Sequence, residues 1–272
     1  MKSPELLERL LVCPITREPL RFAGKQMVSS GGRSYPVLDG VPVLRPGPVK
    51  KIDPRHESNA ISEEFQQYMR SADGPVLFLG AGSTSFRADN VFELEYDLFR
   101  NTDILADAHR LPLADGSVAA VLALNVFEHL AEPSVAASEI HRVLCDGGRV
   151  MIHTAFLQPL HEEPAHYYNA SEFGVRRWFQ KFSDVVVTVS GNFNPYFALS
   201  WFASELLLRV RAQVGVKESE ILANTTLREI ALAWQTGRHS SADLFKVFER
   251  LPDDIQRRLA AGFQLSGRKA GP

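Results

Sequence analysis

The sequence predicts an α/β fold built on a doubly wound, mostly parallel β-sheet, and three observations lead to it. Between residues 60 and 190, short apolar runs typical of strands alternate with stretches of helical periodicity. The strand-like runs are continuously apolar, as expected of strands covered on both faces. The first of them, "PVLFLG", breaks into glycines, which is typical of a strand that ends in a tight turn. This order predicts helices on both faces of one sheet.

Composition narrows the classes of protein that the chain can belong to. Its 272 residues are 45% apolar, which is enough to bury one main domain with additions. A net charge of −2 provides no general basic field, so nucleic acid is a disfavoured partner. No apolar run reaches membrane-spanning length, and "MKSPELLERLLVCP" lacks the uncharged core of a signal peptide, so we expect a cytoplasmic protein.

Residues 1–47 are expected to form a small β-rich module. "SPELLERLLVCP" predicts a short helix, since Ser3 can cap its N-terminus and Glu5 adds a carboxylate to its first turn. The runs "LRFAG", "KQMVSS" and "RSYPVLDGVPVLRPG" predict short strands joined by glycine turns. Residues 48–59 hold prolines and no apolar period, which is typical of a linker.

Residues 60–190 are expected to form the main, Rossmann-like domain. "ISEEFQQYMRSA" predicts its first helix, and the apolar runs "PVLFLG", "NVFELEYD", "SVAAVLALNV" and "GGRVMIHTAF" predict four core strands. In the helix "PSVAASEIHRVLCDGG" we expect a glycine pair to end the helix and four residues to be buried: Val135, Ile140, Val143 and Leu144. "SDVVVTVS" predicts a later strand. The link from Gly82 to the second strand leaves room for a very short helix or none.

Residues 191–272 carry three amphipathic stretches, "ALSWFASELLLRVRAQVG", "TLREIALAWQT" and "ADLFKVFERLPDDIQRRLAAGF". They predict a helical C-terminal extension. It can serve as a homodimer surface or as a further layer over the sheet, and the sequence leaves both uses open.

Three features along the sheet domain have the order that a nucleoside ligand requires. In open parallel sheets a ligand lies at the carboxyl ends of the strands, where the strand order reverses. Gly80 and Gly82 allow a close approach of backbone N–H groups after the first strand. Asp97 ends the second apolar run, where a carboxylate can accept both ribose hydroxyls, and Asp107 lies beyond the next short strand, in reach of an adenine amine.

Together these residues resemble the class I S-adenosylmethionine-dependent methyltransferases, of the type encoded with polysaccharide biosynthesis. The most specific match runs from Asp107 to Thr154, through "DAHRLPLADGS", "FEHL" and "EIHRVLCDGG". The resemblance implies S-adenosyl-L-methionine as the cofactor. It also implies which residues bind this cofactor. Gly80, Ala81 and Gly82 would contact its methionine end, and Asp97 with Leu98 its ribose. Asp107 and Ala108 would border its adenine, and Asn125 and Val126 would line the floor of the cofactor site.

The front module resembles the small zinc-ribbon-like domain that activates some tRNA and release-factor methyltransferases. Many relatives hold zinc with four cysteines. Here Cys13 has Thr16 where the paired thiol would lie, and the one other cysteine is the distant Cys145. We therefore expect no metal, and a module held together by its apolar residues.

The segment "FLQPLHEEPAHYYNASEFGVRRWF" resembles the acceptor-side segment of methyltransferases encoded with sugar-polymer enzymes. His161 and His166 are the candidate bases, because histidine has a suitable pKa, and Tyr167 and Tyr168 are the candidate acceptor-binding residues. The alternative is that these residues only order the loop. A zinc site is disfavoured, because His161 and His166 do not share a helical face and Pro164 interrupts the segment.

The leading hypothesis is a methyltransferase that acts on a small-molecule or glycan-type acceptor, at oxygen. A second hypothesis is methylation of tRNA or of a translation factor, which the front module suggests and the acidic charge balance opposes. A third is a non-catalytic scaffold or partner subunit that binds S-adenosylmethionine. All three require the same cofactor site.

Overall fold

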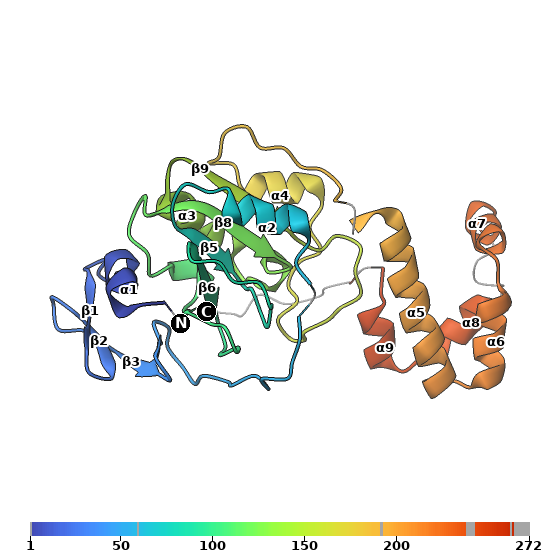
Figure 1. Cartoon of the computed structure of the whole chain (residues 1–272). Helices are drawn as coiled ribbons and strands as arrows, with labels where there is room; N and C mark the ends of the chain where they lie inside the picture. Colours follow the sequence, from blue (N-terminus) through green and yellow to red (C-terminus); the bar gives the residue numbers. More distant parts are fainter. Residues whose placement is uncertain (1, 59, 191–192, 238–242, 262, 264–272) are drawn as a thin grey trace, which may run out of the picture. The chain divides into compact units, whose positions relative to one another are not determined.

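The computed structural model describes residues 2–58, 60–190, 193–237, 243–261 and 263 (Figure 1). Its contacts divide the chain into two compact units. The first holds Met1–Phe156 and Tyr167–Val187, and the second holds Leu157–His166 and Thr188–Pro272. The N-terminal module and the sheet domain therefore form one unit, and the loop with the two candidate histidines up to His166 belongs to the other.

The N-terminal module is a helix on a small antiparallel sheet, as predicted. Helix α1 spans Pro4–Leu10, and the Ser3 hydroxyl accepts the Leu6 N–H at 3.3 Å. Strands β1 (Leu20–Ala23), β2 (Gln26–Ser29), β3 (Ser34–Leu38) and β4 (Val41–Pro42) pair in sequence order. The buried side chains at its centre include Leu7, Leu11, Cys13, Leu20 and Met27.

The second sheet is wholly parallel and confirms the predicted Rossmann-like fold. It consists of β5 (Val76–Leu79), β6 (Val91–Glu95), β7 (Ile104–Leu105), β8 (Val118–Leu124) and β9 (Leu144–His153), in the order β7-β6-β5-β8-β9. Figure 1 labels all of these strands except β7. The chain proceeds outward from β5 to β7 and then crosses to β8. The direction of winding therefore reverses between β5 and β8, where such sheets bind ligands.

Alternate residues of β5 face the two layers of helices. Val76 and Phe78 pack with Phe65 and Met69 of α2 (Glu63–Arg70). Leu77 and Leu79 join the core that contains α3 (Pro133–Val143) and the residue that follows α4 (Glu172–Trp178), Phe179. No helix lies between β5 and β6, which confirms the expectation of a missing first crossover helix.

The N-terminal module extends the edge of the parallel sheet. Val43 forms a parallel bridge with Leu105 of β7, and the Leu44 N–H donates to the Leu105 carbonyl at 2.7 Å. Further along, Lys51 forms a second parallel bridge, with Leu98. Because unpaired edges of sheets are exposed hydrogen-bonding groups, this pairing satisfies the β7 edge within the chain.

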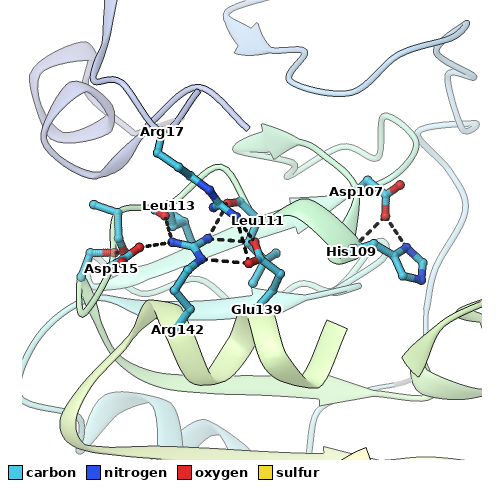
Figure 2. A network of polar contacts seen from close by, with 10 residues as sticks. Arg17, Asp107, His109, Leu111, Leu113, Asp115, Glu139 and Arg142 are labelled. Atoms are coloured by element: carbon cyan, nitrogen blue, oxygen red, sulfur yellow. Dashed lines mark hydrogen bonds and ion pairs between the residues drawn. The ribbon is translucent and has the colours of Figure 1, made fainter. Parts of the chain in front are cut away.

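A network of ion pairs joins the same module to α3 (Figure 2). Arg17 Nη2 donates to both carboxylate oxygens of Glu139, at 2.9 and 3.0 Å, and Arg142 donates to the same carboxylate at 2.9 Å and to Asp115 at 2.6 Å. Both guanidinium groups also donate to the Leu111 carbonyl. Burial opposes ionisation of Glu139, but hydrogen bonds from the two arginines hold its pKa below the ordinary value.

We expect Arg17→Ala and Glu139→Ala each to lower the free energy of unfolding by about 1–3 kcal/mol, since each leaves a charged partner less satisfied. In a double-mutant cycle followed by urea unfolding, the two changes should show a coupling of about 1 kcal/mol. Arg33→Ala is the control, because Arg33 is exposed in the same module. Strictly additive effects of the two substitutions would refute this role for the network.

Three expectations about the sheet domain are wrong. Helix α3 ends at Val143 rather than at the glycine pair, because Leu144 already has the extended backbone that begins β9, and Val135 on that helix is 39% exposed. Residues 183–190 form no strand in the described chain, and Val186 and Val189 are 80% and 71% exposed. Valine runs favour strands only where an edge is present to pair with them.

The second unit is helical, as predicted for the C-terminal extension. It contains α5 (Pro195–Gln213), α6 (Val216–Asn224), α7 (Leu227–Gln235), α8 (Asp243–Glu249) and α9 (Asp253–Arg258). Its core gathers around four buried side chains, Val210, Val247, Leu251 and Ile255. In the part of the chain that the structure describes, no helix has both the length and the apolar character needed to cross a bilayer.

Candidate functional site

The glycine turn follows directly after β5. Gly80 and Gly82 have φ of +66° and +65°, a region that side chains disfavour. The Gly80 N–H donates to the Leu94 carbonyl of β6 at 2.9 Å, which fixes the start of the turn. A Cβ on Gly80 would lie 2.4 Å from Val126 Cγ2, and one on Gly82 would lie 2.4 Å from Ser58 Oγ. Both positions therefore require glycine for their backbone and for their surroundings.

A buried carboxyl group lies beside this turn, and sequence analysis missed it. Glu95 is the last residue of β6, is 5% exposed, and accepts the N–H groups of Gly82, at 2.5 Å, and of Ala81. Burial raises the pKa of Glu95 to about 8, against the opposing effect of the Gly82 hydrogen bond. An acidic residue that ends a strand next to a glycine turn has the position expected of a ribose acceptor.

Asp97 and Leu98, which were expected at the ribose, lie beyond the end of β6 and have other partners. Asp97 Oδ1 accepts Arg45 Nη2 at 3.0 Å and the Lys50 N–H at 3.2 Å. The Arg45 side chain is 1% exposed, and its guanidinium group lies over the Tyr96 ring, 3.9 Å from the centroid. The backbone of Leu98 pairs with the linker. The contacts of Asp97 and Leu98 therefore hold the linker against the sheet domain.

Asp107 and Ala108 follow β7, at the same edge of the sheet as the glycine turn. Asp107 caps a 3₁₀ helix, Ala108–Arg110, by accepting the His109 N–H at 2.9 Å, and the same oxygen lies 2.6 Å from His109 Nδ1 (Figure 2). Ala108 is 7% exposed. The carboxylate of Asp107 is 40% exposed, so a ligand can reach it.

Asn125 and Val126 follow β8. Asn125 has a φ of +55°, and its N–H donates to the His153 carbonyl at 3.0 Å. Val126 packs against Gly80, as the close approach of its Cγ2 shows. The carboxyl ends of four neighbouring strands thus carry Gly80, Glu95, Asp107 and Asn125, which is the edge where the winding reverses.

Comparisons with known proteins find matches to the sheet domain and to the N-terminal module. Residues 86–152 match a family model described as a methyltransferase domain. The N-terminal module matches a UPF0434 protein of Maricaulis maris (strain MCS10), 45% identical over 54 residues that cover 19% of this chain and 84% of that protein. By its N-terminal module the chain belongs to the UPF0434 family, and its sheet domain carries the match to the methyltransferase domain.

Solved structures of methyltransferases are similar to the chain at low identity. A SAM-dependent methyltransferase from Aquifex aeolicus is 15% identical with a TM-score of 0.34, over 44% of this chain and 76% of that one. A Haemonchus contortus phosphoethanolamine N-methyltransferase 2, solved with phosphomonomethylethanolamine and S-adenosylhomocysteine, is 16% identical with a TM-score of 0.38. That match covers 66% of this chain and 50% of the Haemonchus contortus chain.

The cofactor of this class is S-adenosyl-L-methionine, and the residues of the methyltransferase domain fit it. The glycine turn and buried Glu95 supply a bare backbone and an acceptor at adjacent positions. Ser83, 2% exposed at the end of the turn, has a hydroxyl with no hydrogen-bond partner among the described residues. Its N–H donates to Ser58 Oγ at 2.9 Å, so the linker also reaches this turn.

Tyr167 and Tyr168 are held by the 3₁₀ helix Phe127–His129, which follows β8. Their N–H groups both donate to the Glu128 carbonyl, at 2.8 and 3.2 Å. The Tyr168 hydroxyl donates to the Ala131 carbonyl, and its ring packs edge-on against Trp178. Tyr167 is 53% exposed, so it has the more accessible ring of the pair.

His161 and His166 lie together in the second unit. Their ring centroids are 4.3 Å apart, and the His161 N–H donates to His166 Nδ1 at 3.2 Å. His161 Nδ1 lies 2.9 Å from the Pro159 carbonyl, which can only accept, so this nitrogen carries the proton and Nε2 is the basic nitrogen. The Leu160 N–H and Glu163 both bond to Arg258, which ties this loop to α9.

In the N-terminal module, Cys13 has polar neighbours of its own. Its Sγ lies 3.0 Å from the Tyr35 hydroxyl and accepts the Thr16 N–H at 3.3 Å. Burial opposes the thiolate, but hydrogen bonds from Thr16 and Tyr35 leave the pKa of Cys13 below its ordinary value. Burial and the Cys13 contact raise the pKa of Tyr35 to about 12, so the phenol stays protonated and can donate to the sulfur.

Proposed function

We propose that the chain transfers a methyl group from S-adenosylmethionine to a hydroxyl oxygen of a small-molecule or glycan-type acceptor. The observation that carries the proposal is the buried Glu95 hydrogen-bonded to the glycine turn, with Asp107 following the next strand at the same sheet edge. When bound, the cofactor would supply an electrophilic methyl group on a sulfonium centre.

Within this proposal, each residue at the carboxyl edge of the sheet binds a different part of the cofactor. Glu95 takes the ribose hydroxyls, because it ends β6 beside the turn, whereas Asp97 is engaged by Arg45. Asp107 takes the adenine amine, with Ala108, Asn125 and Val126 against the rings. The turn from Gly80 to Gly82 takes the methionine end, where unhindered backbone is needed.

The acceptor side of the proposal rests on the sequence and on local hydrogen bonds. His161 is our candidate base, because its Nδ1 is held by the Pro159 carbonyl and Nε2 is therefore the nitrogen that can take the hydroxyl proton. His166 supports it through the bond from the His161 N–H. Tyr167 is our candidate acceptor contact because its ring is exposed.

The test is transfer of labelled methyl groups from S-adenosylmethionine to nucleotide sugars, glycan fragments and tRNA. We expect a sugar hydroxyl to be methylated, and His161→Ala to lower kcat by about 100-fold, the usual contribution of a general base, while cofactor affinity is unchanged. Methylation of tRNA would favour the translation-related hypothesis. Cofactor binding without transfer to any acceptor would favour the scaffold.

A further inference from the structure

A chain of hydrogen bonds links Asp107 to the start of α3 through the His109 ring. Figure 2 shows the part of it between Asp107 and His109. His109 Nδ1 lies 2.6 Å from Asp107 Oδ1, and His109 Nε2 accepts the N–H of Glu132, the N-cap residue of α3, at 3.2 Å. The imidazole is 21% exposed. One ring thus connects the acidic residue after β7 with an element that begins after β8.

The two partners fix the tautomer of His109. A backbone N–H can only donate, so Nε2 must offer its lone pair to Glu132. An ionised carboxylate can only accept, so the proton of the neutral ring lies on Nδ1 and points at Asp107. Because both nitrogens are used, the ring has one orientation, and turning it over would break both bonds.

The same contacts fix the Asp107 carboxylate. Its Oδ1 accepts both the backbone N–H and the ring N–H of His109. Its Oδ2 accepts no hydrogen bond from the described residues, although the carboxylate is partly exposed. The two bonds to Oδ1 remove the rotational freedom of the side chain, so Oδ2 is presented in one direction at the sheet edge.

We propose that His109 is a positioning residue for the cofactor: it locks Asp107 so that Oδ2 accepts a hydrogen bond from the exocyclic amine of adenine. This inference rests on the proposed function, because it requires adenosine to lie at this edge. His109 itself does not touch the cofactor. Its contribution is that the acceptor is already ordered before the ligand arrives, which lowers the entropic cost of binding.

Calorimetry with two ligands tests the proposal. S-Adenosylhomocysteine carries the amine, and S-inosylhomocysteine has a carbonyl oxygen in its place. We expect the wild-type protein to prefer the first, and His109→Ala to weaken it by roughly tenfold, the usual effect of disturbing a hydrogen bond to a charged group, with little change for the second. A general loss of structure would weaken both ligands alike.

Two further variants separate positioning from folding. His109→Asn keeps a donor near the place of Nδ1 and should retain most of the preference for the amine. Arg110→Ala is the matched control, because Arg110 is exposed on the same 3₁₀ helix. Equal weakening of both ligands by His109→Ala, or an unchanged preference, would overturn the inference. Binding of neither ligand by the wild-type protein would instead overturn the proposed function.

Discussion

Glu95→Ala is expected to weaken S-adenosylhomocysteine binding by about 30-fold, because two hydrogen bonds from the ribose to this carboxyl group contribute about 1 kcal/mol each. Asp97→Ala should change the affinity by less than about threefold, a difference of well under 1 kcal/mol. Calorimetry on both variants measures the contrast. The reason lies in their partners: Glu95 faces the glycine turn, and Asp97 faces Arg45 and Lys50.

Two controls keep this contrast interpretable. Glu95→Gln retains an acceptor oxygen for the N–H groups of Ala81 and Gly82, so it should preserve the turn and lose less affinity than the alanine variant. Asp97→Ala should instead lower the free energy of unfolding, since it removes an acceptor from buried Arg45. A large loss of affinity in Asp97→Ala with normal binding by Glu95→Ala would reverse our assignment of the two acids.

Gly80→Ala is expected to lower the free energy of unfolding by about 2–5 kcal/mol. A left-handed backbone costs a side chain about 1–2 kcal/mol, and overpacking adds about 1–3 kcal/mol. Both apply here, because φ is +66° and the new Cβ would lie 2.4 Å from Val126 Cγ2. Urea unfolding of the variant gives the value directly.

Gly147→Ala separates the backbone contribution to the loss of stability from the packing contribution. Gly147 has φ of +73° with nothing within 4 Å of the added Cβ, so it should show the backbone penalty alone. Adding Val126→Ala to Gly80→Ala should recover part of the stability, because it removes the clashing methyl group. Equal losses at Gly80 and Gly147, with no recovery by the second substitution, would contradict the packing we describe.

Most elements of the fold could be predicted from the sequence because their signals are local. Continuously apolar runs predict the buried parallel strands. Ser3 caps α1 as predicted, by accepting the Leu6 N–H at 3.3 Å. The same local reading failed at residues 183–190, where strand propensity found no edge to pair with. Strand pairing is a long-range property that propensity does not contain.

Glu95, which our proposal places at the ribose, was missed by sequence analysis for a physical reason. Glu93, Glu95 and Asp97 alternate along one run, so period alone cannot tell which of them ends the strand. Sequence analysis chose Asp97 because it ends the apolar run, whereas the strand itself ends at Glu95. The structure buries Glu95 and stabilises it with backbone N–H groups, an arrangement that depends on the neighbouring turn.

The contacts that the linker and the front module make with the sheet domain could not be predicted from the sequence either. Arg45 and the bridge from Val43 to Leu105 join segments that are far apart in the chain, and neither carries a local signal. Ser58 at the glycine turn belongs to the same group. Such contacts are decided by which surfaces remain unpaired once the sheet has formed.

The most direct measurement is a crystal structure of the chain with S-adenosylhomocysteine bound. Our account predicts the ribose hydroxyls on the Glu95 carboxylate, the adenine amine on Asp107 Oδ2, and the amino-acid end against the turn from Gly80 to Gly82. A ribose bound by Asp97, with Glu95 still bonded only to the turn, would contradict it, and so would a ligand bound away from this edge of the sheet.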